Sequence, residues 1–337
     1  MSARPDFSAF ALFAGLPPDE LEDLGRLMRP FAAPAGSVLF AEGAAGDGMY
    51  LLQAGTLEAV RPGPHGTAES LATLGPGAVV GELSMLGPGT RTATVNVLED
   101  ASGWILDPRA FDLLRLDLRP GSVALARRLG ELAAERMRDR YEAIAARMGV
   151  VPTPGGYAGA LPEVAEAPGE LAHLATTLMF ARMSAEAVAE LAAGARRLHA
   201  ARGALVLTPG VRPPALYVVV HGAVEVSVRG PATVQRLRLA GPGRAVGHLG
   251  VLGTEPAVAE ARARERTVLL ELPWPRVYEL LEGAGEAARA FVVAFSEDVV
   301  RALRYAERPV AALRTAPGAA GLSPQPPAPA VATRRPS

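Results

Sequence analysis

The sequence predicts an α+β protein made of two tandem β jelly-roll barrels, each flanked by helices on its N-terminal and C-terminal sides. Three observations lead to this prediction. A chain of 337 residues is long for a single core and natural for two domains. Short apolar and β-branched runs separated by glycine corners are typical of antiparallel barrels. The pattern of the first half also returns in the second half.

Helical patterns lie on both sides of the first barrel. We expect a helix over residues 7–16 that docks on the barrel, and a second helix from Pro17-Pro18 to Phe31. Helix resumes near Pro108, and a long amphipathic helix is expected over about 121–148. The apolar stripe of this long helix indicates either permanent packing on its own barrel or contact with a partner, which includes a second copy of the chain.

Between these helices the periodicity changes from helix to strand. Gly36, Gly43 and Gly55 stand at the corners between the runs. The alternation of apolar and polar residues in each run is that of a half-buried strand. The segments expected as strands are 37–40, 49–52, 57–60, 92–97 and 103–106.

The second half of the chain repeats the first. Eight residues return 167 positions later, with apolar matched to apolar and glycine to glycine, and the turn Gly75-Pro76-Gly77 returns as Gly241-Pro242-Gly243. Such self-similarity indicates a duplicated domain. The eight are Phe13, Leu16, Leu24, Gly36, Gly43, Tyr50, Gly55 and Glu58, with partners Phe180, Met183, Leu191, Gly203, Gly210, Tyr217, Gly222 and Glu225.

Composition excludes several kinds of site. The formal net charge is −1 and is spread through the chain, so no basic field indicates a nucleic-acid partner. The chain has no cysteine, which excludes disulfides, thiolate metal sites and cysteine nucleophiles and fits the cytoplasm. The five histidines have no metal-ligand spacing, and no catalytic motif or membrane span is evident. We therefore expect no enzyme, no metal, no cofactor and no membrane contact.

One stretch, residues 81–95, has the outline of an anion site. Gly81 allows close approach of backbone to a ligand, and residues 82–86 can form one helical turn whose free N–H groups point at an anion. Arg91 follows, at the start of the strand expected from Thr92. A guanidinium offers a fork of donors to two phosphate oxygens, whereas the Glu82 carboxylate is an acceptor suited to a hydroxyl.

This pattern, Gly-Glu-Leu-Ser and then Arg-Thr-Ala-Thr, resembles the phosphate-binding cassette of the cyclic nucleotide-binding domain family, the module of the catabolite activator and of protein kinase A and G regulatory regions. The resemblance implies that Glu82 accepts from the ribose 2′-hydroxyl and that Arg91 pairs with the exocyclic phosphate oxygens. It also implies that Asp47 steadies the arginine. The ligand-binding residues that it implies are Gly81, Glu82, Leu83, Ser84, Arg91 and Thr92.

The second repeat has lost this chemistry. His248 stands in place of the glutamate, Ala257 in place of the arginine, and Pro214 in place of the aspartate. Val258 replaces the threonine. We expect no nucleotide in the second barrel unless another arginine, such as Arg244 or Arg262, substitutes.

These patterns divide the chain into four segments. We expect a cyclic nucleotide-binding domain over 1–149, a Pro- and Gly-containing linker over 150–168 and a degenerate second domain over 169–308. Residues 309–337 are rich in proline and alanine, and we expect them to be a disordered tail.

The functional prediction is a non-enzymatic cyclic-nucleotide sensor whose first domain relays binding, through its C-terminal helix, to the second domain or to a protein effector in trans. The alternatives are a ligand-independent interaction protein and a transcription regulator of the catabolite-activator kind that lacks a recognisable DNA-binding domain. Thr92 suits cyclic GMP as in the kinase G branch, but a hydroxyl there also occurs in the catabolite activator. The composition resembles that of a high-GC bacterium, which favours cyclic AMP by a small margin.

Overall fold

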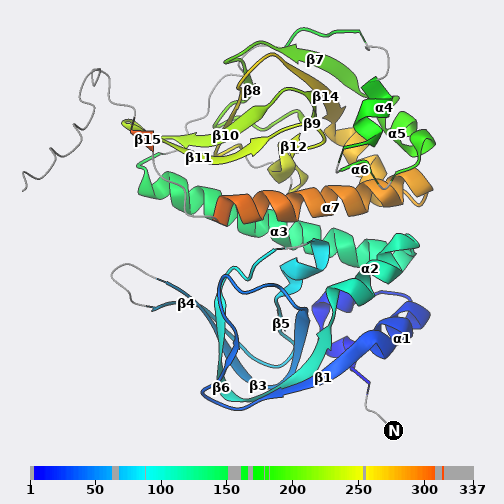
Figure 1. Ribbon diagram of the computed structural model, residues 1–337, viewed down its shortest axis with the longest axis vertical. Coiled ribbons are helices and arrows are strands. Elements are labelled where there is room, and N and C mark those ends of the chain that lie inside the picture. Colours follow the sequence, from blue (N-terminus) through cyan, green and yellow to red (C-terminus); the bar gives the residue numbers. More distant parts are fainter. Residues whose placement is uncertain are drawn as a thin grey trace, which may run out of the picture.

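The computed structural model shows two β-barrels stacked along the long axis, with two long helices between them (Figure 1). It describes residues 4–62, 68–87, 89–150, 161–165, 170–177, 179–181, 183–252, 256–307 and 313–314. Every strand pair among these residues is antiparallel. The predicted α+β architecture of two tandem barrels flanked by helices is confirmed.

The first barrel contains two long strands that run through most of it. Strands predicted separately at 49–52 and 57–60 join as β3, and those predicted at 92–97 and 103–106 join as β6. β3 and β6 pair with each other. β6 also pairs with β1 and β2, and β3 also pairs with β4 and β5. The elements are β1 Met28–Ala33, β2 Val38–Phe40, β3 Met49–Pro62, β4 Ala68–Leu74, β5 Val79–Val80, the 3-10 turn η4 Glu82–Leu86, β6 Thr94–Leu106 and α2 Pro108–Leu116.

The N-terminal region differs from the prediction in two places. Residues 7–16 form two short 3-10 helices, η1 Phe7–Ala9 and η2 Ala11–Phe13, because Phe10 between them is extended. The next helix, α1 Pro18–Leu27, ends before Phe31, and the chain continues as β1 along β6. Pro30 explains this early end, because proline lacks the N–H that a helix interior needs and drives the preceding residue into an extended conformation.

The second barrel repeats the backbone of the first. Left-handed glycines recur at matched corners: Gly55 has φ 92° and Gly222 has 83°, and Gly81 has φ 74° and Gly247 has 97°. The two sheets have the orders β15-β11-β10-β13-β8 and β12-β9-β14-β7. The elements are α4 Glu170–Ala175, α5 Ala185–Ala192, β7 Arg196–Ala200, β8 Leu205–Leu207, β9 Ala215–His221, β10 Val224–Arg229, β11 Thr233–Ala240, β12 Ala245–Val246, η5 His248–Leu252, β13 Glu260–Ala263, β14 Thr267–Pro273, α6 Trp274–Glu282, α7 Glu286–Glu307 and β15 Leu313–Arg314.

The long helix predicted after the first barrel is α3 Pro120–Arg147, and it runs beside α7 between the barrels (Figure 1). Gly130 allows the two helices to approach closely, because a Cβ there would lie 2.6 Å from the Ser296 hydroxyl. Further along, Arg140 Nε donates to the carbonyl of Ala306 over 3.3 Å. The apolar face of α3 is therefore covered within the same chain, which leaves the predicted homodimer through this helix without structural support.

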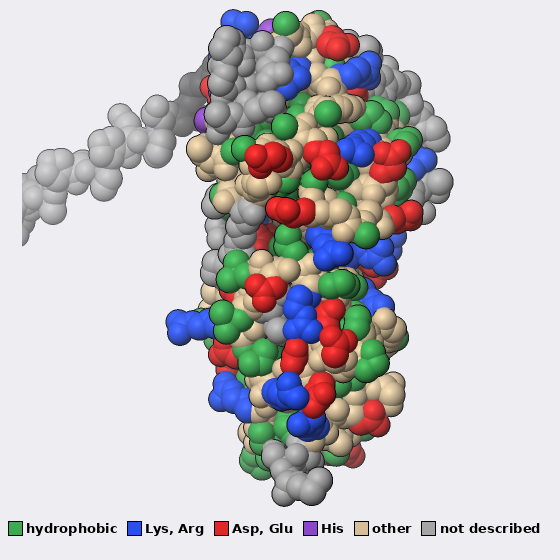
Figure 2. Space-filling view, turned by 90° about the vertical axis from the view of Figure 1, so that its right-hand side faces the viewer, with side chains coloured by type: hydrophobic (Ala, Val, Ile, Leu, Met, Phe, Trp, Pro, Cys, Tyr) green, Lys and Arg blue, Asp and Glu red, His purple; other side chains and the backbone are tan. Residues whose placement is uncertain are grey.

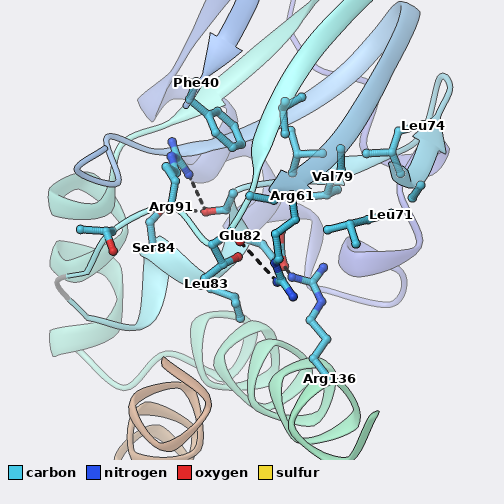
Figure 3. A pocket seen from close by; sticks show the side chains of 18 of the residues that line it. Phe40, Arg61, Leu71, Leu74, Val79, Glu82, Leu83, Ser84, Arg91 and Arg136 are labelled. Carbon is cyan, nitrogen blue, oxygen red and sulfur yellow. Dashed lines mark hydrogen bonds and ion pairs between the residues drawn. The ribbon is translucent and has the colours of Figure 1, made fainter. Parts of the chain in front are cut away.

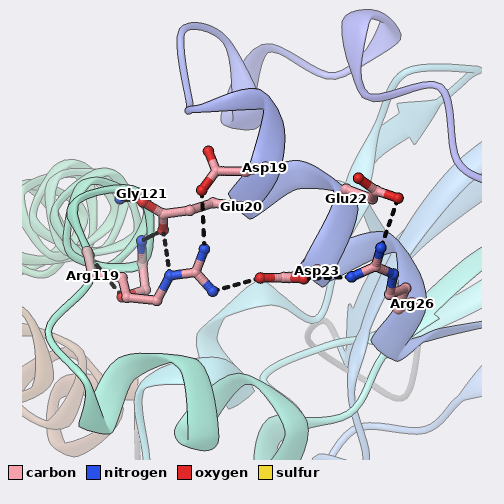
Figure 4. Close-up of polar contacts among 8 residues, drawn as sticks. Asp19, Glu20, Glu22, Asp23, Arg26, Arg119 and Gly121 are labelled. Carbon is pink, nitrogen blue, oxygen red and sulfur yellow. Dashed lines mark hydrogen bonds and ion pairs between the residues drawn. The ribbon is translucent and has the colours of Figure 1, made fainter.

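An acidic side chain of α1 fixes the start of α3 (Figure 4). The buried Glu20 carboxylate accepts from the backbone N–H groups of Gly121 at 2.9 Å and Ser122 at 3.1 Å. The N-cap residue Arg119 offers no capping side chain of its own, and it instead pairs with Asp23 at 2.6 Å. A carboxylate at a helix N-terminus satisfies free donors and complements the helix dipole. α3 is thus anchored to the first domain at its N-terminal end.

Acidic and basic side chains are interspersed on the face shown in Figure 2, with no large field of one sign. None of the described helices is long and apolar enough to cross a membrane. Most of the predicted linker, and the predicted tail apart from β15, lie outside the described residues. Within the linker, Glu163 forms an isolated antiparallel bridge with Leu198 of β7.

Candidate functional site

The turn after β5 has the predicted shape. Gly81 is left-handed, and η4 begins directly after it at Glu82. A Cβ on Gly81 would lie 2.0 Å from Arg91 Nη1, so only glycine allows the arginine to approach this backbone. The carbonyl of Gly81 accepts from the same nitrogen at 3.2 Å. The glycine therefore provides both the space and an acceptor for Arg91.

Arg91 is buried, with 5% of its surface exposed. Its Nη2 donates to the Asp47 carboxylate and, over 2.8 Å, to the carbonyl of Gly48. Its guanidinium carbon lies 4.0 Å from the centre of the Phe40 ring, a cation–π contact. These bonds and the one to Gly81 use three of the five N–H donors. Nε–H is one of the two left, and it has no hydrogen-bond partner among the described residues.

Asp47 links Arg91 to a second aromatic side chain. The Tyr50 hydroxyl donates to the other Asp47 oxygen at 3.0 Å. Burial, together with the neighbouring carboxylate, raises the pKa of Tyr50 to about 12, so the hydroxyl stays protonated at neutral pH. Asp47, the predicted support of Arg91, therefore contacts the arginine and is itself oriented by Tyr50.

Glu82 faces α3. Its side chain is 3% exposed, and Oε1 lies 2.6 Å from Nη1 of Arg136, whose own side chain is 43% exposed. Figure 3 shows this ion pair at one side of a pocket that Arg91 also lines. The carboxylate that sequence reasoning assigned to a ligand thus also holds the C-terminal helix of the domain.

The pocket between the barrel and α3 has a volume of about 500 Å³. This volume lies within the usual range of small-molecule sites. Charged side chains from the barrel and α3 share its wall with apolar side chains. The main lining residues are Phe40, Arg61, Leu71, Leu74, Val79, Glu82, Arg91, Thr92, Arg136, Asp139 and Arg140.

The remaining predicted residues, Leu83, Ser84 and Thr92, line the same pocket, but their hydrogen bonds are to other parts of the protein. The Ser84 hydroxyl donates to the Gly81 carbonyl at 2.7 Å, so it stabilises the helical turn. Leu83 is buried, and its carbonyl accepts from Arg304 at 2.6 Å. Thr92 borders the pocket, and its carbonyl accepts from Arg61 at 3.3 Å.

Sequence reasoning missed three contributors to this site. Phe40 lies in a strand that was predicted, but nothing in its pattern places it against the guanidinium. Arg136 lies on the predicted long helix, whose packing angle determines which residue meets Glu82. Arg304 belongs to α7 in the second domain and donates to the carbonyls of Leu83 and Gly87. Only the tertiary structure brings these residues together.

The matching site in the second barrel is nearly filled. A cavity of about 40 Å³ remains beside Ala257 and Val258, and Met137 and Tyr141 of α3 line it. Both α3 side chains are buried, with 2% and 4% exposed. Neither Arg244 nor Arg262, the candidate substitutes, lines this cavity. The first domain's helix therefore fills, and so plugs, the matching site of the second barrel.

A buried polar network adjoins the plug. His248 Nε2 lies 3.0 Å from Asp298 Oδ2, and Arg238 Nη2 lies 3.3 Å from His248 Nδ1. Because an arginine can only donate, Nδ1 is the acceptor and Nε2 carries the proton, so the imidazole is neutral. Burial lowers the pKa of His248 and outweighs the opposing effect of Asp298. In the described part of the chain, no group of His, Asp and Glu side chains is arranged to hold a metal ion.

Comparison with known proteins identifies both barrels. The family model of the cyclic nucleotide-binding domain matches residues 31–116 and 197–283, which together are more than half of the chain. The acetyltransferase Pat of Mycolicibacterium smegmatis is 34% identical over 112 residues, which are 32% of this chain and 32% of that protein. A CRP-like cAMP-activated global transcriptional regulator of Mycobacterium tuberculosis is 28% identical over 100 residues, which are 30% of this chain and 45% of the regulator. The chain thus matches less than half of the length of these relatives.

A solved structure of the regulatory domain of Toxoplasma gondii PKA with cAMP aligns with 80% of this chain and 87% of its own. The sequence identity is 19% and the TM-score is 0.31.

Proposed function

The chain belongs to the cyclic nucleotide-binding domain family, and on that premise we propose that it is a non-enzymatic sensor whose first barrel binds a cyclic mononucleotide. One observation carries this proposal. Arg91, with its plane fixed by Asp47 and Phe40, and the acceptor Glu82 border the same cavity of about 500 Å³. This arrangement offers donors for a phosphate and an acceptor for a ribose hydroxyl.

In this proposal Gly81, Glu82, Leu83, Ser84, Arg91 and Thr92 form the ligand site and Asp47 supports it. Arg91 gives its two remaining donors to phosphate oxygens, and one of them is the unpartnered Nε–H. Burial of this side chain makes such a contact strong, because water competes little for it. Ser84 acts indirectly, by holding η4 in shape through the Gly81 carbonyl.

Glu82 would connect ligand binding to α3. If a ribose 2′-hydroxyl donates to Oε1, the carboxylate oxygen that lies nearest Arg136 and accepts no hydrogen bond from it, the hydroxyl competes with Arg136 for that oxygen. The ion pair is partly exposed, and such pairs contribute about 1 kcal/mol or less, so a ligand can replace it. Binding therefore weakens the hold of the first barrel on its C-terminal helix.

The second barrel would receive this signal. α3 places Met137 and Tyr141 in the degenerate pocket of the second barrel. In the other direction, Arg304 of α7 donates hydrogen bonds to the backbone carbonyls of Leu83 and Gly87 at η4. A shift of α3 must therefore change the packing in the second barrel. We assign the segment 1–149 to the sensor domain and 169–308 to a domain that holds α3 instead of a nucleotide. A protein effector would recognise the altered second domain.

We favour cyclic AMP over cyclic GMP as the ligand. The related regulator from Mycobacterium tuberculosis is named as cAMP-activated. Thr92 at the pocket wall suits either base, since a hydroxyl can donate or accept. If that hydroxyl reads the base, Thr92→Ala changes the ratio of the two affinities by roughly fivefold, the equivalent of about 1 kcal/mol.

Titration of the purified intact chain with fluorescent cyclic AMP and cyclic GMP tests the proposal. We expect saturable binding at one site per chain, displaced by the unlabelled cyclic nucleotide and not by its 3′,5′-opened monophosphate. If neither cyclic nucleotide binds, the sensor proposal is wrong and the ligand-independent interaction protein takes its place.

A further inference from the structure

The second barrel carries a separate small cavity of about 140 Å³ between β11, the turn after it and α7. It lies on the α7 side of Arg238, whereas the plugged nucleotide site lies on the α3 side. Three arginines line it, together with one carboxylate. Its charged and aromatic lining residues are Arg238, Arg244, Asp298, Arg301 and Tyr305.

The single carboxylate of this cavity, that of Asp298, already accepts hydrogen bonds from three groups of the second domain. Asp298 accepts from Arg244 at 3.1 Å, from the backbone N–H of Ala245 at 2.9 Å and from His248 at 3.0 Å. Burial acts to raise the pKa of Asp298, but the hydrogen bond from His248 and the charge of Arg238 hold it well below its usual range. Asp298 is therefore ionised and is satisfied by groups other than Arg301.

Two of the three arginines have no carboxylate partner in the described part of the chain. Arg238 is 7% exposed, and its Nη2 reaches only the Ala245 carbonyl and the His248 ring, while its Nε–H has no acceptor. Arg301 is half-buried and forms no hydrogen bond or ion pair with any described residue. Burial and the charge of Arg244 lower the pKa of Arg301, and the charge of Asp298 offsets this only in part. Three positive charges thus converge with one negative charge.

We propose that this cavity binds a phosphate-type anion, held by Arg238, Arg244 and Arg301. Half-buried cations without a counter-charge cost stability, and an anion at this place would relieve the repulsion between Arg244 and Arg301. Guanidinium groups match phosphate oxygens in geometry, and Tyr305 also lines the cavity. The volume admits a small anion or the phosphate group of a larger molecule, and is below the usual size of a complete ligand pocket.

This site is spatially separate from the nucleotide site of the first barrel. Its residues come from the second domain alone, and none of them lines the pocket of about 500 Å³. A phosphate ion in free solution and a phosphate group on a nucleotide share the same chemistry, so the test must distinguish the two.

Thermal melting and calorimetric titration of the intact chain test the proposal, with sodium phosphate compared with sodium chloride at matched ionic strength. We expect a saturable rise in melting temperature with phosphate for the wild type. Arg301→Met should weaken phosphate binding at least tenfold. Without phosphate this variant should melt at or above the wild-type temperature, because it removes an unpaired half-buried charge. A normal melt shows that the loss of binding is not a folding defect.

Arg236→Met is the control, since it removes an exposed arginine that lies outside the cavity, on the strand β11 that carries Arg238. It should bind phosphate like the wild type. Equal binding by Arg301→Met and the wild type overturns the proposal, and so does an equal loss in both variants, which would indicate a general charge effect. If AMP binds in an Arg301-dependent way and inorganic phosphate does not, the anion is carried by a nucleotide; if both bind, free phosphate suffices.

Discussion

His248 and Asp298 make in the second barrel the contact that Glu82 and Arg136 make in the first, with the acidic residue moved from the barrel to the helix. In each case the first residue of the 3-10 turn meets the C-terminal helix of its own domain. The Glu82 ion pair has an exposed arginine, whereas both side chains of the His248 pair are almost fully buried. We propose that a ligand can replace the first contact, whereas the second lies within the core.

The His248 contact predicts acid sensitivity of the second domain. Because its folded pKa lies below the ordinary value of 6.5, the native state binds fewer protons than the unfolded state at mildly acidic pH. Stability is therefore complete above about pH 6.5 and falls as the pH decreases, by at most about 1.4 kcal/mol per pH unit for one proton. The lowered pKa of Asp298 adds a loss with the same sign only below about pH 4.

Denaturant unfolding at a series of pH values from 7.5 to 5 checks this. His248→Gln should flatten the dependence of the unfolding free energy on pH. His221→Gln, which changes an exposed histidine, should leave it unchanged. A wild-type chain that is equally stable at pH 7 and pH 5 would contradict the neutral imidazole.

The Arg136 contact predicts that its removal raises ligand affinity. Arg136→Met leaves the buried Glu82 carboxylate without its cation in the free protein, and a ribose hydroxyl then has no competitor. The pair is partly exposed, so we expect a gain of about 1 kcal/mol or less, which is up to roughly fivefold in affinity for cyclic AMP. Calorimetric titration measures the gain. Weaker binding by the variant would show that Arg136 contacts the ligand instead of competing with it.

Tyr141 should be a stability determinant of the second barrel although it belongs to the first domain's helix. Tyr141→Ala leaves a cavity where its ring fills the degenerate pocket, and truncation of a buried aromatic side chain costs about 3 to 5 kcal/mol. Glu142→Ala, at the neighbouring exposed position of α3, should cost little. Chemical denaturation of both variants measures the loss of unfolding free energy in each. Similar small losses would mean that α3 does not plug the second barrel.

Glu20 should anchor α3 through charge and hydrogen bonding. Glu20→Gln keeps the shape but loses the carboxylate that caps Gly121 and Ser122, and loss of such a cap costs about 1 to 2 kcal/mol. The matched control is Glu22→Gln on the same helix. Glu22 pairs with the exposed Arg26 (Figure 4) and with the exposed Arg4. Melting temperatures of the two variants should separate clearly. An equal change in melting temperature in both variants would show that Glu20 contributes no more than an exposed charge.

Much of the fold could be predicted from local pattern. The glycine corners and the 167-residue repeat predicted two barrels because left-handed turns need glycine at fixed places, and Gly55 and Gly222 both have that conformation. The end of α1 was predicted too late because the apolar periodicity continues past Leu27, and the effect of Pro30 on the helix was given too little weight.

The arrangement of the two domains could not be predicted in the same way. Arg304 meets the η4 backbone across more than 200 residues of sequence, and no local pattern encodes such a contact. The apolar stripe of α3 predicted burial but not its partner, since Met137 and Tyr141 would suit any apolar surface. Which surface packs against the apolar face of a helix is determined by the tertiary structure.

The central claim is that Arg91 receives the phosphate of a cyclic mononucleotide, and calorimetric titration of the intact Arg91→Ala variant with cyclic AMP tests it most directly. Truncating one partner of a buried charge pair costs about 2 to 5 kcal/mol, so we expect affinity to fall roughly thirty-fold to several thousand-fold. The fold should survive, because the Asp47 carboxylate left behind is 57% exposed and stays hydrated. Arg29→Ala, at an exposed position of β1, should bind like the wild type. An Arg91→Ala affinity within threefold of wild type would show that this side chain does not contact phosphate.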